Sequence, residues 1–378
     1  MAEIHGSCDD RFGAVREALE RNLQAEELGA RVAVDLDGET VVDIWGGHTD
    51  IEQTKPWTED TIVNVWSTTK TITSLAALML VDRGELDVYA PVAKYWPEFA
   101  ENGKEGIEVR HLMSHTSGVS GWDPPFVGED MYDWESSVAK LAAQAPWWEP
   151  GTASGYHALN QGHLVGEVIR RVSGKTLKQF VADEIAGPMG ADFQIGAREE
   201  DAGRISDVIP PPPLPFDLEA LDPASPVVRT FTGPVADAAA ANTAAWRAAD
   251  MGATNGHGNA KSVVQIMRVM SLGGEAGGVR LLSPETIELV FDQQSDNVDL
   301  VLGVPLRFGI GFALPKHETI PYIPDGKICF WGGWGGSLIV MDLERRLTIG
   351  YTMNRMAPGI IGSPRAETYL NAVYGALG

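Results

Sequence analysis

Strand-like segments stand near both ends of this chain of 378 residues, and a long helix- and loop-rich stretch separates them. Residues 31–45 are rich in valine and turn at Asp37-Gly38, which predicts a hairpin of two strands. Similar segments return near the C-terminus, at residues 328–331, 337–341 and 347–353. Helical periodicity at residues 12–28 and 363–377 predicts a helix at each end of the chain. The two ends are therefore expected to pair in one antiparallel sheet flanked by the terminal helices, an α+β arrangement.

The stretch between these strands predicts a second lobe. Residues 1–66 and 300–378 are assigned to a discontinuous α/β sheet lobe, and residues 67–299 to a mostly helical lobe. A cleft between two lobes is the usual place for a small-molecule site. We therefore expect the functional residues to come from both lobes.

Residues 205–255 have the most unusual composition of the middle region. They combine the run Pro210-Pro211-Pro212-Pro213 with an alanine-rich stretch. Such a composition is typical of a linker or of a long loop. Phe216, Phe231 and Trp246 lie within it and favour a loop that packs over the cleft.

A serine and a lysine three residues apart stand at the start of an apolar helix predicted over residues 71–81. Positions i and i+3 share a helix face, so Lys70 can reach the Ser67 oxygen, and a buried lysine is neutral enough to accept its proton. The pair is a candidate nucleophile beside its base. A second Ser-x-x-Lys, Ser137 with Lys140, lies in a polar amphipathic stretch and is expected on a solvated helix face.

The charge balance and the cysteine content exclude several classes of protein. The formal net charge of −23 repels phosphate backbones and anionic membrane surfaces, so neither nucleic acid nor a membrane is an expected partner. Cys8 and Cys329 are too few for a disulfide framework or a four-thiolate metal site. The N-terminus lacks a basic start with an apolar run, and no window is long and apolar enough to span a membrane. A globular cytoplasmic protein is expected.

Four short motifs together carry a family resemblance. They are Ser67-Thr68-Thr69-Lys70, His111-Leu112-Met113-Ser114-His115-Thr116-Ser117-Gly118, Ser154-Gly155-Tyr156-His157-Ala158 and Trp331-Gly332-Gly333. In this order they resemble the serine β-lactamase-like superfamily over nearly the whole chain. The Trp-Gly-Gly motif is more similar to the family VIII carboxylesterases than to class C β-lactamases or DD-peptidases, which carry Lys-Thr-Gly there. The resemblance implies a β-lactamase/DD-peptidase-like fold and a serine esterase that forms an acyl-enzyme intermediate and needs no cofactor.

The same resemblance assigns catalytic roles to residues of this chain. Ser67 is the implied nucleophile, and Lys70 and Tyr156 share the proton transfer, with either as the base. A phenol has a pKa near 10, and Lys70 is expected to lower that of Tyr156. The backbone N–H groups of Ser67 and Trp334 are the expected oxyanion hole.

Two departures from the β-lactamase pattern favour neutral esters over penicillins. Trp331 stands where a lysine would meet the substrate carboxylate, and Ala158 stands where an asparagine would bind an acylamino group. The glycines beside Trp331 let the backbone approach a substrate closely. The residues expected to bind the substrate are Trp331, Gly332, Gly333, Trp122, Trp148 and His257, and Trp147 and Trp334 are further candidates for an aromatic cleft wall.

Other readings of the sequence stay open at this point. His111 and His115 stand four residues apart, as in a helical metal site, although no third ligand is evident and no metal is expected. An acyltransferase or an amide or β-lactam hydrolase of the same fold is an alternative to an esterase of small-molecule esters. A non-catalytic penicillin-binding-like protein is disfavoured because Ser67, Lys70 and Tyr156 are all present.

Overall fold

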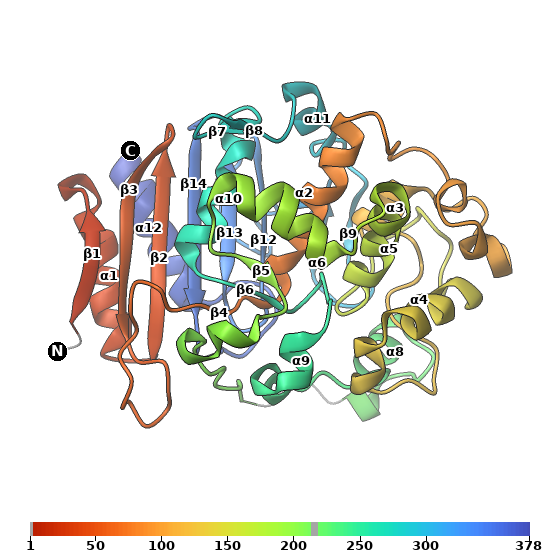
Figure 1. The fold of residues 1–378 in the computed structure, drawn as a ribbon, viewed down its shortest axis with the longest axis horizontal. Helices are drawn as coiled ribbons and strands as arrows, with labels where there is room; N and C mark the ends of the chain where they lie inside the picture. Colours follow the sequence, from red (N-terminus) through yellow and green to blue (C-terminus); the bar gives the residue numbers. More distant parts are fainter. Residues whose placement is uncertain (1–2, 213–217) are drawn as a thin grey trace.

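The computed structural model describes residues 3–212 and 218–378. Its largest element is a nine-stranded antiparallel sheet. The strand order is β1-β3-β2-β14-β13-β12-β11-β10-β9. The strands are β1 (Ile4–Cys8), β2 (Gly29–Leu36), β3 (Glu39–Gly47), β9 (Ser295–Val298), β10 (Pro305–Phe308), β11 (Ala313–Leu314), β12 (Ile328–Gly332), β13 (Leu338–Asp342) and β14 (Leu347–Met353). Figure 1 shows the red N-terminal strands beside the blue C-terminal strands. The predicted pairing of the two chain ends in one sheet is confirmed.

The join between the two ends is the pairing of β2 with β14. Val34 faces Ile349 across this pair, and these side chains are buried because both strands lie inside the sheet. The β2–β3 hairpin turns at Asp37 and Gly38, whose φ angles are 54° and 87°. A two-residue turn with positive φ at both positions matches the right-handed twist of the strands, which explains the Asp-Gly pair.

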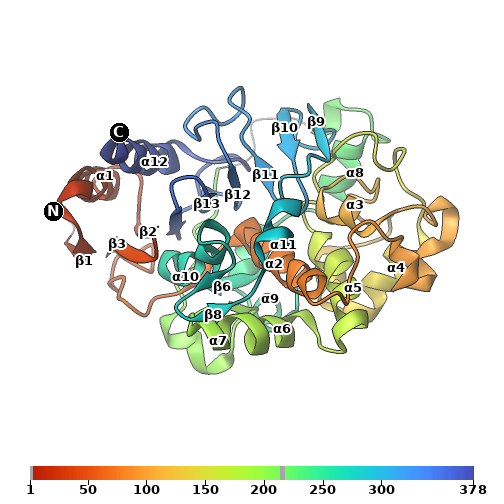
Figure 2. The same cartoon turned by 90° about the horizontal axis from the view of Figure 1, so that it is seen from above.

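Helices cover both faces of the sheet. Figure 2 shows α1 (Gly13–Leu23) and α12 (Pro364–Leu377) on one face and α10 (Ala260–Ser271) on the other. α10 packs against β2, β13 and β14, although it comes from the middle of the chain. The division into lobes at residues 66/67 and 299/300 stays a prediction.

The rest of the described chain is mostly helical and is built around α2 (Thr69–Asp82), which is buried from Thr69 to Leu80 and packs on α5 (Gln161–Ser173). The other helices are α3 (Val109–Met113), α4 (Trp134–Ala143), α6 (Leu177–Phe180), α7 (Gly187–Met189), α8 (Pro226–Thr232), α9 (Ala244–Ala248) and α11 (Pro284–Leu289). Short strands are β4 (Val63–Asn64), β5 (Gln194–Ile195), β6 (Gly256–Gly258), β7 (Glu275–Ala276) and β8 (Val279–Arg280). Among the described residues, no helix combines the length and the apolar character that a membrane span requires.

The segment 205–255 contains α8 and α9. Trp246 on α9 is buried and packs against Trp66, with ring centroids 5.3 Å apart. Phe231 on α8 lines the cleft described below. Phe216, the third aromatic residue of the prediction, lies outside the described residues.

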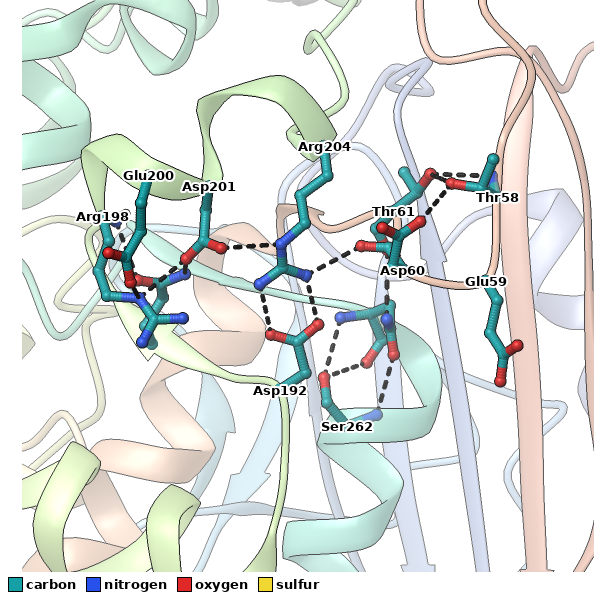
Figure 3. Close-up of polar contacts among 12 residues, drawn as sticks. Thr58, Glu59, Asp60, Thr61, Asp192, Arg198, Glu200, Asp201, Arg204 and Ser262 are labelled. Atoms are coloured by element: carbon teal, nitrogen blue, oxygen red, sulfur yellow. Dashed lines mark hydrogen bonds and ion pairs between the residues drawn. The ribbon is translucent and has the colours of Figure 1, made fainter.

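An ion-pair network around Arg204 fixes the chain that leads to β4 (Figure 3). The guanidinium donates to the Asp201 carboxylate at 2.8 Å, to that of Asp192 at 2.8 Å and to the Asp60 carbonyl at 2.9 Å. Ile62 and Ile205 form a parallel bridge beside it. These contacts hold residues 60–64, and β4 leads directly into the turn that carries Ser67.

Candidate active site

Ser67 lies at a sharp turn between β4 and α2. The turn is a single 3₁₀ element, Trp66–Thr68, and Trp66 has a left-handed backbone with a φ of 52°. That conformation is costly for a residue with a large side chain. The Trp66 indole packs between Trp246 and Trp334, at ring-centroid distances of 5.3 and 5.1 Å, and this packing holds the strained turn in place. The turn presents Ser67 to a cleft in the protein.

Lys70 is buried one helical turn after Ser67. Its Nζ lies 3.0 Å from the Ser67 Oγ, 2.7 Å from the Ala158 carbonyl oxygen and 3.0 Å from that of Ala253. Burial lowers the pKa of Lys70 well below its usual value, and no carboxylate of the described residues forms an ion pair with it. A neutral amine has two N–H donors for the two carbonyls and one lone pair for the Ser67 hydroxyl. The geometry therefore suits proton transfer from Ser67 to Lys70.

Tyr156 lies in the loop before α5, and its side chain is buried. The Trp331 indole N–H donates to the phenolic oxygen at 3.0 Å, which leaves the phenol proton free for another acceptor. Burial raises the pKa of Tyr156, the Ser67 hydroxyl and the Trp331 indole lower it, and the Asp299 carboxylate raises it. The net direction is upward.

The predicted lowering of the Tyr156 pKa by Lys70 is therefore wrong. Burial disfavours the charged form of Lys70, and Lys70 is not among the groups that shift the pKa of Tyr156, although its Nζ lies 4.9 Å from the Tyr156 ring centroid. The raised pKa of Tyr156 favours its protonated form, which suits a proton donor, and the lowered pKa of Lys70 favours its neutral form, which suits a proton acceptor.

The turn after β12 supplies a free backbone donor. The N–H of Gly333 donates to the Ser337 carbonyl at 2.8 Å, and the N–H of Gly336 donates to the Gly333 carbonyl at 3.0 Å. Between them, the Trp334 N–H donates to no acceptor among the described residues. The Ser337 hydroxyl donates to the Val65 carbonyl at 2.8 Å, which ties this turn to the turn that carries Ser67.

Gly333 is required where these two turns meet. A Cβ at this position would overlap the Ser337 hydroxyl and the Val65 carbonyl and would lie 2.9 Å from the Trp66 Cβ. Glycine alone allows this close approach of the two backbones. The approach supports the expectation that N–H groups from both turns act on one oxygen atom.

The cleft at Ser67 is an apolar cavity of about 160 Å³. Ser67, Tyr156 and Thr254 supply its polar groups. The other described residues that line it are Trp66, Ala158, Leu159, Leu218, Phe231, Val235, Ala236, Trp334 and Ile360, none of which carries a charge. A ligand in this cavity is therefore held mainly by apolar contact.

Several residues predicted to bind substrate do not line the cleft. Trp122 is fully buried against Phe126, and its indole N–H donates to the Ser137 carbonyl at 3.1 Å. His257 is fully buried in β6, with Nδ1 2.8 Å from the Asn255 carbonyl oxygen. Both side chains are fully buried, and neither is among the residues that line the cleft.

Trp147, Trp148 and Trp331, which were also predicted to line the cleft, do not line it either. Trp148 packs over Gly155 and donates to the Ala153 carbonyl at 3.0 Å, while the Trp147 ring lies under the Arg229 guanidinium. Trp331 contacts Tyr156, and Gly332 and Gly333 shape the turn. The tryptophans that line the cleft are Trp334, which was predicted, and Trp66, which was missed. Only the position of Trp66 next to Ser67 could have indicated its role.

The second Ser-x-x-Lys has no such geometry. Ser137 lies on α4 but is buried, and the predicted solvated position is wrong for this residue. Its hydroxyl donates to the Asp130 carbonyl at 2.9 Å. The Lys140 Nζ donates to the Pro125 carbonyl at 2.8 Å. The two side chains are therefore engaged with separate main-chain groups.

The two histidines considered for a metal site are also engaged with the main chain. Nδ1 of His111 accepts from the Glu108 N–H, and Nδ1 of His115 accepts from the His157 N–H, both at 3.1 Å. Within residues 3–212 and 218–378, no three His, Cys, Asp or Glu side chains are placed to hold a metal ion together.

Comparison with known proteins identifies the family. The family model described as Beta-lactamase matches residues 15–372. The chain belongs to the beta-lactamase family. Among members of known sequence, esterase/beta-lactamase LipL of Mycobacterium tuberculosis is 31% identical over 375 residues, which cover 96% of this chain and 86% of LipL.

Solved structures agree with this membership of the beta-lactamase family. The structure of a family VIII carboxylesterase is 38% identical, with a TM-score of 0.93, and the match covers 99% of this chain and 100% of that chain. A penicillin-binding protein homolog from Caulobacter crescentus is 35% identical, with a TM-score of 0.90 and the same coverage of both chains. The predicted β-lactamase/DD-peptidase-like fold and the resemblance to family VIII carboxylesterases are confirmed.

Proposed function

We propose that this protein is a serine esterase that hydrolyses small carboxylic esters through an acyl-enzyme intermediate. The observation that carries the proposal is the 3.0 Å contact between the Ser67 hydroxyl and a buried lysine whose other partners are two carbonyl oxygens. Relatives named as esterases and a carboxylesterase structure with a TM-score of 0.93 support the reaction class.

In the first half of the reaction, neutral Lys70 takes the Ser67 proton while the Ser67 oxygen attacks the ester carbonyl. The N–H groups of Ser67 and Trp334 hold the resulting oxyanion, and each such donor contributes about 2.7–4 kcal/mol to the transition state. Tyr156 gives its proton to the departing alkoxide. Lys70 then gives the proton that it took from Ser67 to the Tyr156 phenolate. This step restores the neutral amine and the phenol, and the alcohol leaves.

In the second half, water attacks the acyl group on Ser67. The same groups act in reverse, so that a proton is taken from the water and returned to the Ser67 oxygen as the carboxylic acid leaves. The apolar side chains that line the cleft, among them Leu159 and Ile360, suit a small apolar acyl group.

The substrate class follows from the uncharged cleft. Trp331 is bonded to Tyr156 and offers no cation to a substrate carboxylate, and Ala158 lines the cleft without an amide group. Each missing polar anchor weakens transition-state binding by about 1–3 kcal/mol. We therefore propose that neutral small-molecule esters are preferred over penicillins. A cytoplasmic location and the lack of nucleic-acid or membrane partners stay predictions from charge and sequence.

The proposal is tested by comparing p-nitrophenyl butyrate with benzylpenicillin as substrates. With two missing anchors, the expected kcat/KM for the ester is higher by about 30-fold to 10⁴-fold. Ser67→Ala is expected to abolish ester hydrolysis, and Ser137→Ala, the matched control, to leave it unchanged. An equal or higher kcat/KM for benzylpenicillin would restore the β-lactamase alternative.

An acyltransferase is the second candidate, because an apolar cleft favours an organic alcohol over water as acceptor. Adding butanol to the ester assay separates the two. A butyl ester formed in preference to free acid at low butanol concentration would indicate a transferase.

A further inference from the structure

The loop that carries Tyr156 is anchored from outside at four consecutive backbone N–H groups. Ser154 donates to the Asn297 Oδ1 at 3.1 Å, Gly155 to the His115 carbonyl at 2.9 Å, Tyr156 to the Asp299 Oδ1 at 3.0 Å, and His157 to the His115 Nδ1 at 3.1 Å. The loop has no regular secondary structure, so it has no helical or sheet hydrogen bonds of its own. Its conformation therefore depends on these outside acceptors.

Asp299 is the anchor that bonds to Tyr156 itself. Its side chain lies after β9, and the residue is 1% exposed. Oδ1 accepts from the N–H groups of Tyr156, Val301 and Leu302, at 3.0, 3.0 and 2.9 Å. Oδ2 has no hydrogen-bond partner among the described residues. Burying a carboxylate with one unsatisfied oxygen is costly, so this position calls for an explanation beyond packing.

Tyr156 is thereby held at two points, its main-chain nitrogen and its phenolic oxygen. Asp299 holds its main-chain nitrogen, and the Trp331 indole N–H holds its phenolic oxygen at 3.0 Å. A reacting group displaced by about 1 Å can lose about 10²-fold in rate. A substitution that removes the Asp299 carboxylate releases the main chain of Tyr156. The Trp331 contact with the phenolic oxygen is then the remaining one of these two restraints.

We infer that Asp299 is a positioning residue for Tyr156: its buried carboxylate sets the main chain of Tyr156 so that the phenol can give its proton to the departing alkoxide. The inference rests on the proposed esterase function. Asp299 does not line the cleft, so its effect on the reaction comes through the main chain of Tyr156.

The test is a double-mutant cycle in kcat/KM with ethyl butyrate. Asp299→Ala is expected to lower kcat/KM by about 10–100-fold in the wild-type background. In the Tyr156→Phe background the same change is expected to lower it by less than about twofold, because no phenolic proton is left to misplace. An equal loss in both backgrounds would show a merely structural role and overturn the inference.

Two controls sharpen the cycle. Asn297→Ala removes the anchor of Ser154, two residues away, and is expected to cost less than about threefold in kcat/KM. Asp299→Asn keeps the Oδ1 acceptor and is expected to stay within about fivefold of the wild type. An Asn variant as impaired as the Ala variant would contradict the assigned contact. If Asp299→Ala does not fold, Asp299→Ser, whose hydroxyl is too short for all three N–H groups, replaces it in the cycle.

Comparing two esters with different leaving groups tests the role of Asp299 independently. p-Nitrophenolate departs without a proton, so Asp299→Ala is expected to impair p-nitrophenyl butyrate at least about threefold less than ethyl butyrate. Equal impairment of both esters would contradict the inference. Failure of the proposed function would look different, since an active Ser67→Ala variant would remove the esterase assignment before any effect of Asp299 was measured.

Discussion

Replacing Lys70 by methionine tests the division of labour between Lys70 and Tyr156. Methionine has a similar length and no basic nitrogen, so the variant fills the same buried space without a proton acceptor. Loss of a positioned base lowers kcat by about 10²–10⁴-fold, which corresponds to about 2.7–5.5 kcal/mol of activation free energy. We expect a loss in this range for Lys70→Met, with little change in KM.

The structure also predicts a cost in stability for this variant. The carbonyl oxygens of Ala158 and Ala253 lose the donor that now lies 2.7 and 3.0 Å away. Each buried acceptor left unpaired costs about 1–3 kcal/mol. The melting temperature is therefore expected to fall, and activity is measured at a temperature at which circular dichroism shows the variant to be folded.

The assay is kcat/KM for ethyl butyrate, with Lys70→Arg as the control for charge. Arginine stays protonated and cannot accept a proton, so this variant is expected to be as inactive as Lys70→Met. In the wild type, activity is expected to fall as the pH drops through the pKa of Lys70, because the protonated amine cannot accept the Ser67 proton. A Lys70→Met variant with more than a tenth of wild-type activity, or an active Lys70→Arg, would refute Lys70 as the base.

Two further predictions concern the turns around the site. Gly333→Ala is expected to lower kcat/KM by at least about tenfold, because its Cβ forces apart the two turns that hold the oxyanion donors. Gly375→Ala is the control, because a Cβ there has open space around it. Equal activity of both variants would argue against this geometry. Burial raises the pKa of Asp201, but hydrogen bonds from Arg204, Gln194 and Arg198 outweigh it and bring the pKa to about 2. The unfolded value is about 3.9, so this stabilisation is complete above that pH and is lost as the pH falls towards about 2. The difference in melting temperature between the wild type and Asp201→Asn should therefore shrink from pH 6 to pH 3, and a constant difference would contradict the sign.

The sequence was most informative where local chemistry sets the structure. The Asp37-Gly38 pair predicted the β2–β3 turn because few other residues adopt positive φ at both positions. The spacing of Ser67 and Lys70 predicted their contact because i and i+3 share a helix face. The family motifs added Tyr156, whose phenol lies in the same cleft.

The sequence was least informative where partners come from distant segments. β1 went unnoticed because its three central residues are exposed and show no apolar alternation. α10 has clear helical periodicity, but periodicity does not say that it packs on the sheet. Nothing in the sequence distinguishes Trp122, which lies in the core, from Trp334, which lines the cleft.

The protonation state of Tyr156 shows the same limit. Burial and the charge of Asp299 raise its pKa, and both depend on the folded structure. The sequence predicted a buried Lys70 as the base for Ser67 and also expected it to lower the pKa of Tyr156; burial lowers the pKa of Lys70, which supports the first expectation and not the second. The direction of proton transfer therefore required the structure.

Ser67 is expected to carry the acyl group during turnover. Acid quenching during hydrolysis of p-nitrophenyl butyrate, followed by peptide mass spectrometry, tests it directly. We expect one butyryl group on the peptide that contains Ser67 and none on the Ser67→Ala variant. A butyryl group on the Ser137 peptide, or turnover by Ser67→Ala at the wild-type rate, would contradict the account.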